Sequence, residues 1–126
     1  MADAIRVLVV DEDPDVVELT SVFLERESDC IEVTAITDPT TALDHVADGD
    51  YDCVVSDLRM PEMDGLELFE AVRETNPAMP FFLFSAVDDD RAGKEAREAG
   101  VTGFVQKGAG TEHYTELVEG IEAAVD

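Results

Sequence analysis

The sequence predicts one α/β domain built around a parallel β-sheet, and three observations support that prediction. The chain has 126 residues, of which 45% are hydrophobic, and this suits a single domain with a sizeable core. Short apolar segments alternate along the chain with longer amphipathic segments. No internal repeat, linker or low-complexity tract interrupts this alternation. Strands that alternate with helices form parallel sheets with right-handed crossover connections.

Five short apolar segments are the predicted strands. They are rich in Val, Ile and Phe, and several are expected to be buried on both faces of the sheet. In chain order they are RVLVV at 6–10, IEVTAI at 31–36, DCVVS at 52–56, PFFLFSA at 80–86 and GFVQ at 103–106.

The segments between and after these strands are predicted helices, because their apolar residues recur at helical spacing. They cover residues 15–26, 39–47, 66–72 and 114–125. Pro39 directly after Asp38 is typical of a capped helix start, and Gly65 allows tight geometry where the third helix begins. A further helix at 88–99 offers only alanines to the core, so we expect it to shift most easily.

The chain is strongly acidic, with 31 Asp and Glu against 8 Lys and Arg and a formal charge of −23. This charge argues against nucleic acid or an anionic membrane as a partner, since both require a basic face. Repulsion among so many negative charges destabilises the folded protein unless salt screens them. We therefore favour a halophilic source. The alternative is simply an acidic protein of high solubility.

The remaining composition indicates a cytoplasmic protein. We find no segment with the length and hydrophobicity of a signal peptide or of a membrane span. Cys30 and Cys53 have no metal-binding spacing and are expected to stay reduced. His45 and His113 are expected on helix surfaces rather than at a metal.

Polar residues lie at the ends of four of the five predicted strands. Asp11 and Glu12 follow the first strand, Asp57 follows the third, Ser85 ends the fourth, and Lys107 follows the fifth. Ligand sites of open parallel sheets form at the carboxyl ends of the strands. In the flavodoxin-like strand order 2-1-3-4-5 the first and third strands are neighbours, which would bring Asp11 and Glu12 beside Asp57.

Such a cluster favours phosphoryl chemistry. Three carboxylates in one cleft repel one another and require a cation, and oxygen ligands select a hard ion such as Mg²⁺. With that charge compensated, one carboxylate can attack phosphorus and form an aspartyl phosphate. Lys107 would offer a positive charge, and Ser85 a hydroxyl, to the phosphoryl oxygens. Each residue alone suits a helix cap, a turn or a solvated surface, whereas their joint occurrence at strand ends favours a site.

Four motifs resemble the receiver domain of response regulators in two-component signalling. They are VLVVDEDPD at 7–15, VVSDLRMPEMDG at 54–65, FFLFSA at 81–86 and GFVQK at 103–107, of which DLRMPEMDG is highly specific. The resemblance covers residues 5–125. It implies one receiver domain over residues 1–126, with a doubly wound (βα)5 fold and no effector domain in this chain.

The resemblance also implies an acceptor and a metal site. Asp57 would be the phosphoacceptor. Asp11 and Glu12 would place Mg²⁺ or Mn²⁺ together with Asp57 and the backbone carbonyl of Arg59. Asp13 would lie near the start of the first helix rather than on the metal.

A two-state switch is the third implication of the resemblance. A sensor histidine kinase or phosphotransfer protein would donate the phosphoryl group, and Ser85 and Lys107 would be drawn toward its oxygens. The 88–99 helix would then tilt and Phe104 would turn inward. The surface of the fourth helix, fifth strand and fifth helix would bind an output domain or protein, or a second copy of the chain. The domain would not be a classical enzyme, because it would catalyse only its own phosphorylation and dephosphorylation.

Two positions depart from the family pattern. Gly108 stands where the family has proline, often after a cis peptide, and a cis bond before a non-proline residue costs about 2.5–4 kcal/mol. Either this peptide is trans, or Gly108 supplies unusual dihedral angles. The Arg59 side chain should overhang the site, pair with Glu12 or a phosphoryl group, and tune dephosphorylation.

Two other functions compete with a phosphoacceptor. Asp11, Glu12 and Asp13 resemble the opening motif of haloacid-dehalogenase-type phosphatases, with Asp11 as the nucleophile. That family needs a further acidic motif after the lysine, whereas only one predicted helix follows Lys107. The second competitor is a degenerate receiver that binds a partner constitutively. Gly108, which replaces the proline of the family, is the reason to retain this alternative.

Overall fold

The computed structural model describes residues 4–49, 51–60, 63–85, 90–107 and 112–125. In these residues five strands alternate with five helices, as the sequence predicts. The elements are β1 (Ile5–Val10), α1 (Pro14–Glu27), β2 (Ile31–Ile36), α2 (Pro39–Ala47), β3 (Cys53–Ser56), α3 (Gly65–Thr75), β4 (Phe81–Ser85), α4 (Asp90–Ala99), β5 (Gly103–Gln106) and α5 (Glu112–Val125).

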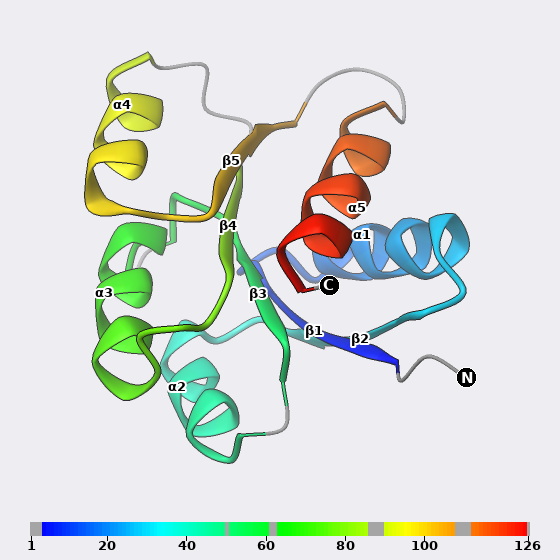
Figure 1. The fold of residues 1–126 in the computed structure, drawn as a ribbon, viewed down its shortest axis with the longest axis horizontal. Coiled ribbons are helices and arrows are strands. Elements are labelled where there is room, and N and C mark those ends of the chain that lie inside the picture. Colours follow the sequence, from blue (N-terminus) through cyan, green and yellow to red (C-terminus); the bar gives the residue numbers. More distant parts are fainter. Residues whose placement is uncertain (1–3, 50, 61–62, 86–89, 108–111, 126) are drawn as a thin grey trace.

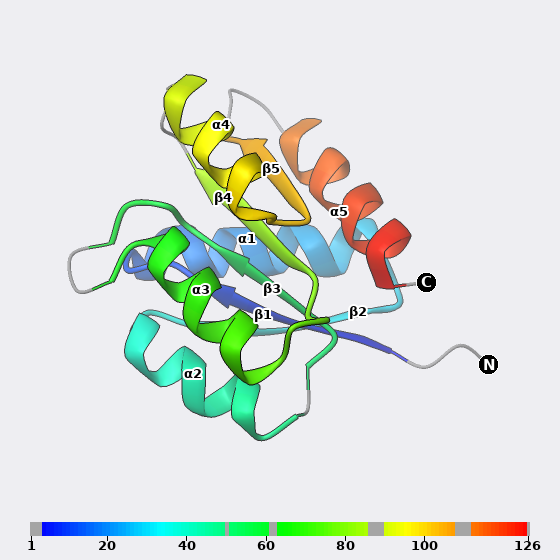
Figure 2. The ribbon, with the colours of Figure 1, turned by 60° about the vertical axis from the view of Figure 1, so that its left-hand side comes forward.

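The strands form one parallel sheet in the order β2-β1-β3-β4-β5, which confirms the flavodoxin-like prediction. Helices cover both faces. In Figures 1 and 2, α1 and α5 lie on one side of the sheet, and α2, α3 and α4 lie on the other. From β1 the chain first adds β2 on one side, and then adds β3, β4 and β5 on the other side. The carboxyl ends of β1 and β3 are therefore the topological switch point of the sheet.

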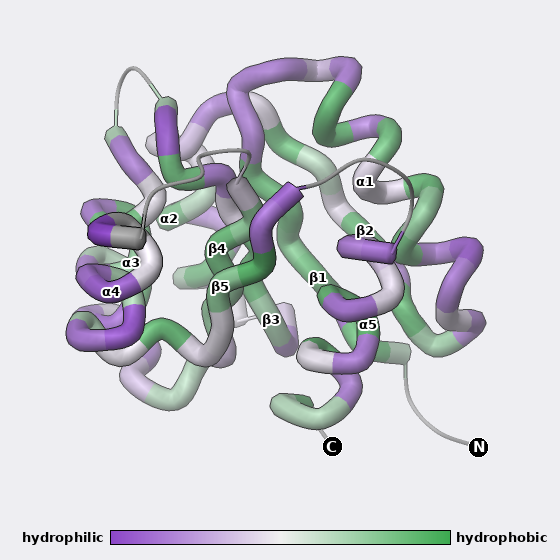
Figure 3. The backbone as a smooth tube through the Cα atoms, turned by 90° about the horizontal axis from the view of Figure 1, so that it is seen from above, coloured by the Kyte–Doolittle hydropathy of each residue, from purple (hydrophilic) through white to green (hydrophobic). Residues whose placement is uncertain are grey.

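Alternate side chains of the central strands enter two separate hydrophobic clusters. On β4, Phe81 and Leu83 pack toward α3 and α4, whereas Phe82 and Phe84 pack toward α1 and α5. Every residue of β3 and β4 is buried, which confirms strands covered on both faces. In Figure 3 the central strands are coloured mostly as hydrophobic, whereas hydrophilic and hydrophobic residues alternate along the helices.

Aspartates begin three of the helices. Asp13, Asp38 and Asp64 each accept a hydrogen bond from a backbone N–H of the first turn, and this satisfies donors that the helix leaves unpaired. The cap at Asp38 was predicted. At α3, Glu67 closes a capping box by accepting from the N–H of Asp64.

The short helix α4 has the weak apolar face that the sequence predicts. Its Gly93 and Ala96 are buried, while Lys94 and Glu95 between them are exposed. Small side chains bury little area, so few apolar contacts hold this helix. Its displacement stays a prediction.

The prediction for the histidines is wrong for His113. This residue is only 9% exposed, because its ring packs against Phe84 of β4 and Tyr114 of α5. The cysteines are free, as predicted, with Cys30 exposed and Cys53 buried. Within the described residues no helix is long and apolar enough to cross a membrane.

Candidate functional site

An open pocket of about 250 Å³ lies at the carboxyl ends of β1, β3, β4 and β5. The predicted site residues from four strand ends all line this pocket. Its lining is Asp11, Glu12, Asp13, Val16, Asp57, Arg59, Ser85 and Lys107. Of these, only Val16 and Asp13 were not predicted to take part in binding.

The ladder of the parallel sheet explains why these residues meet. Strands β1, β3 and β5 each continue their hydrogen bonding for one residue beyond the strand end. The N–H of Asp11 donates to Ile36 at 3.2 Å, that of Asp57 to Val10 at 2.9 Å, and that of Lys107 to Ser85 at 2.8 Å. The three side chains are therefore fixed at the same edge by backbone contacts.

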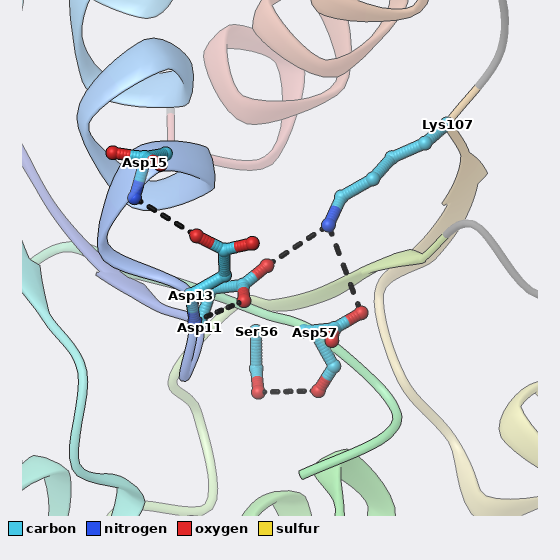
Figure 4. A network of polar contacts seen from close by, with 6 residues as sticks. All are labelled: Asp11, Asp13, Asp15, Ser56, Asp57 and Lys107. Atoms are coloured by element: carbon cyan, nitrogen blue, oxygen red, sulfur yellow. Dashed lines mark hydrogen bonds and ion pairs between the residues drawn. The ribbon is translucent and has the colours of Figure 1, made fainter.

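Lys107 bridges the buried Asp11 and the partly buried Asp57 (Figure 4). Its Nζ lies 2.9 Å from Oδ2 of Asp11 and 3.7 Å from Oδ1 of Asp57. The side chains are 19%, 7% and 15% exposed, respectively, so water screens these charges only in part. The one positive charge of Lys107 therefore faces two carboxylates and offsets only part of their negative charge.

Asp13 lines the same pocket, but its carboxylate caps α1. Its N–H donates to Oδ1 of Asp11 at 3.0 Å, while its own carboxylate accepts from the N–H of Asp15 at 3.0 Å (Figure 4). The side chain is therefore used to begin α1, as expected.

The pKa of the Asp57 carboxyl is raised, first because of burial and also because of the nearby Asp11 charge. Lys107, the backbone N–H of Leu58 and the hydroxyl of Ser85 each lower it without cancelling the rise. Lys107, the Leu58 N–H and the Ser85 hydroxyl thus stabilise the ionised form of Asp57, while burial disfavours it.

The backbone of Asp57 is held as tightly as its side chain. The Ser56 hydroxyl donates to the Asp57 carbonyl at 2.8 Å, and the N–H of Gly65 donates to Leu58 at 2.8 Å. A Cβ at Gly65 would lie 2.5 Å from the Asp57 carbonyl oxygen and 2.6 Å from Cδ2 of Leu83. Sequence reasoning missed Ser56, because a buried serine within a strand carries no motif of its own.

The donor set fits a hard cation with few protein ligands. Asp11 and Asp57 supply anionic oxygens, and Glu12 and Arg59 are exposed at the same pocket. The described residues contain no group of three or more His, Cys, Asp or Glu side chains arranged to hold a metal. Mg²⁺ keeps several waters and is held by one or two carboxylates, so two converging aspartates suit it.

The remaining predicted residues are placed as follows. Ser85 is 1% exposed at the end of β4, and Phe104 is half-buried on β5 against the cluster shared with α3 and α4. Gly108 and the Lys107–Gly108 peptide lie outside the described residues. Phe84, which contacts Lys107, and His113, which stacks on Phe84, were missed because their packing depends on how α5 meets the sheet.

A doubly wound sheet with an acidic, lysine-bridged pocket at its switch point is a flavodoxin-like arrangement. Residues 7–119 match the model of the response regulator receiver domain, and the chain therefore belongs to this family of two-component signalling domains.

Curated relatives extend well beyond the matched region. The chain is 33% identical over 123 residues to a protein-glutamate methylesterase/protein-glutamine glutaminase of Nocardioides sp., covering 96% of the chain and 34% of that relative. It is 28% identical over 102 residues to the transcriptional regulatory protein SrrA of Staphylococcus aureus, covering 81% and 41%. The chain thus spans about a third to two-fifths of the length of these relatives.

Solved structures agree with the fold. A LuxR-family two-component response regulator from Aurantimonas sp. has a TM-score of 0.86 at 29% identity, with 98% of the chain and 86% of that structure covered. The signal receiver domain of the response regulator NarL from Mycobacterium tuberculosis has a TM-score of 0.84 at 29% identity, with 98% of both chains covered.

Proposed function

We propose that the chain is a phosphoacceptor in which Asp57 takes a phosphoryl group from a sensor histidine kinase or a phosphotransfer protein. One observation carries the proposal. The Asp57 carboxylate lies in an open pocket at the switch point, 3.7 Å from an ammonium that it shares with a second buried aspartate. This is a nucleophile with a positive charge placed beside it.

The chemistry can be written with these side chains. An oxygen of Asp57 forms the new bond to phosphorus, and the P–N bond of the donor phosphohistidine breaks, its electron pair returning to the imidazole. Lys107 pairs with the incoming phosphoryl oxygens, and Ser85 donates its hydroxyl to them. Asp11, Glu12, Asp57 and the carbonyl of Arg59 would hold Mg²⁺ or Mn²⁺, which would supply charge compensation.

The switch and its partners belong to the same proposal. The new charge at Asp57 draws Ser85 and Lys107 inward, α4 moves, and Phe104 turns toward the space that α4 leaves. The α4–β5–α5 surface then binds an output domain, an output protein or a second copy of the chain. The protein catalyses only changes in its own phosphorylation, and it works in the cytoplasm without direct contact to nucleic acid.

Labelling with acetyl phosphate and Mg²⁺ tests the acceptor. We expect one phosphoryl group per chain, labile to hydroxylamine, which disappears in Asp57→Asn. The exposed Asp29 lies outside the pocket, so Asp29→Asn is the matched control and should label like the wild type. Steady turnover that is lost in Asp11→Asn would instead indicate a phosphatase, and no label at all would indicate a degenerate binding module.

The same label tests Arg59 and bears on Gly108. We propose that the Arg59 side chain, exposed at the rim of the pocket, modulates loss of the phosphoryl group. The lifetime of the label should therefore change in Arg59→Ala, and an unchanged lifetime would contradict this role. Gly108 is proposed as a second modulator through the backbone that carries Lys107.

We also propose that the acidic surface is adapted to concentrated salt. Raising KCl from 0.1 to 1 M shortens the screening length from about 10 to about 3 Å, so repulsion within a chain of charge −23 should weaken. We expect Tm to rise by about 5 °C or more, which is about 1 kcal/mol for a domain of this size. Chloride is used because sulfate also strengthens apolar burial. A Tm that does not depend on KCl would contradict a halophilic adaptation.

A further inference from the structure

His113 occupies an unusual place for a histidine. It lies in the first turn of α5 and is 9% exposed. Its ring stacks on Phe84 of β4, with centroids 5.5 Å apart and planes at 26°, and it contacts Tyr114 at 4.1 Å. Within the described part of the chain its buried Nδ1 has no hydrogen-bond partner. A buried polar atom without a partner is rare and calls for an explanation beyond packing.

The same Phe84 ring also contacts the phosphoryl site. Phe84 is 3% exposed and directly precedes Ser85. The Nζ of Lys107 lies 5.3 Å from the centroid of its ring, within the range of a cation–π contact. One buried ring therefore connects the imidazole of α5 with the ammonium that bridges Asp11 and Asp57.

We propose that His113 is a positioning residue of the phosphoryl site: its neutral ring holds Phe84 against Lys107, and its protonation is coupled to the state of Asp57. The proposal rests on the function proposed for Asp57. It adds to that function a pH-dependent group on the side of the sheet opposite Phe104, since Phe84 and Phe104 belong to different hydrophobic clusters.

The charges around the His113 ring determine the sign of the coupling between its protonation and the phosphorylation of Asp57. Burial lowers the pKa of His113 first, Lys107 at the end of β5 lowers it further, and Glu116 on α5 raises it. The positive end of the α5 dipole also disfavours a second cation at this position. From β4 the uncharged Phe84 faces the ring, and α1 contributes Phe23, which stacks on Tyr114 at 4.7 Å.

Phosphorylation should therefore make His113 easier to protonate. Phosphorylation replaces the single charge of the Asp57 carboxylate by an acyl phosphate of about −1.5 to −2, so the negative charge beside Lys107 increases and the ammonium repels a protonated imidazole less. Coupling between two sites is reciprocal, so a protonated His113 must favour the phosphorylated form by the same factor. A histidine that merely fills space would show no such dependence.

Titration of the two histidines by proton NMR tests this directly. The chain has only two histidines, and His45→Gln assigns their signals. With the Mg²⁺ concentration equal in both samples, we expect beryllofluoride, a phosphoryl mimic, to raise the pKa of His113 by about 0.5 unit, a threefold change in proton affinity. His45 on α2 contacts Tyr51 instead of the site and is the internal control. An equal pKa of His113 with and without the mimic overturns the proposal.

Two variants separate stacking from charge. His113→Phe keeps the stack but cannot titrate, so the ratio of wild-type to variant affinity for beryllofluoride should rise as the pH falls from 8 through the lowered pKa of His113, toward a limit of about threefold. His113→Ala removes the stack and should weaken binding at every pH. Wild-type behaviour of both variants would overturn the proposal. If the ¹⁹F signal of the bound mimic never forms, the function proposed for Asp57 fails, and this inference fails with it.

Discussion

Replacing Lys107 by methionine is expected to lower the free energy of unfolding by about 2 kcal/mol at pH 7 without Mg²⁺. Methionine keeps most of the aliphatic stem but removes the charge. Asp11 and Asp57 then face each other at 7% and 15% exposure without the ammonium between them. Removing one partner of a buried ionic group leaves the other charges uncompensated, which is why the expected loss exceeds that of a surface ion pair.

The loss should depend on pH in a defined direction. The folded-state pKa of Asp57 is already raised by burial, and Lys107 is the main group that opposes the rise. Without Lys107 the folded protein binds this proton more tightly than the unfolded chain does, so ionisation of Asp57 destabilises the fold. The deficit of Lys107→Met should therefore be largest at neutral pH and shrink as the pH falls through the raised pKa.

Urea unfolding of matched variants checks this expectation. Lys94 is the only other lysine and is exposed on α4, so Lys94→Met changes the net charge equally without touching the pocket. The Asp57→Asn background should reduce the cost of Lys107→Met, because it removes one of the two carboxylates. Added Mg²⁺ should restore part of the stability by binding the folded state. Equal effects of the two lysine variants, or a deficit independent of pH, would refute the assignment.

Alanine at Gly65 is expected to be as damaging, by a purely steric route. The added Cβ would lie 2.5 Å from the Asp57 carbonyl oxygen, a distance that real Cβ atoms do not reach. That oxygen belongs to the backbone of Asp57 and accepts a hydrogen bond from the Ser56 hydroxyl. Moving it away from the new Cβ would therefore cost free energy. Overpacking of this kind costs about 1–3 kcal/mol, and we place Gly65→Ala at the upper end.

The control for Gly65→Ala is Gly93→Ala in α4. There, among the residues that the structure describes, the nearest atoms to an added Cβ belong to the Arg97 guanidinium, at 3.7 Å, which is an ordinary contact. Alanine favours a helix over glycine by about 1 kcal/mol, so this variant should be neutral or slightly stabilising. Beryllofluoride affinity should fall in Gly65→Ala, since Asp57 must shift. Similar urea midpoints and affinities for the two variants would show that the α3 start does not constrain the acceptor.

The sequence was sufficient for the framework of the site. Unbroken apolar segments predicted the strands. Four of the five strand ends are marked by polar site residues, and the ladder fixes the backbone of several of these at one edge, as with Asp57 and Lys107. Pro39 after Asp38 predicted the start of α2 correctly, because capping is local chemistry.

The sequence could not predict what depends on packing between distant segments. The exposure of His113 was misjudged because helical spacing places it next to the buried Tyr114 without showing which ring of β4 lies above it. That Lys107 would pair with Asp11 more closely than with Asp57 is likewise a matter of side-chain geometry across three strands.

The two hydrophobic clusters share no side chain, because the sheet separates them completely in the described residues. The carboxyl edge is where this partition ends. There, Lys107 rests on Phe84, which belongs to one cluster, while Phe104 three residues earlier on β5 belongs to the other. A rearrangement at this border would therefore displace side chains of both clusters, one on each face of the sheet.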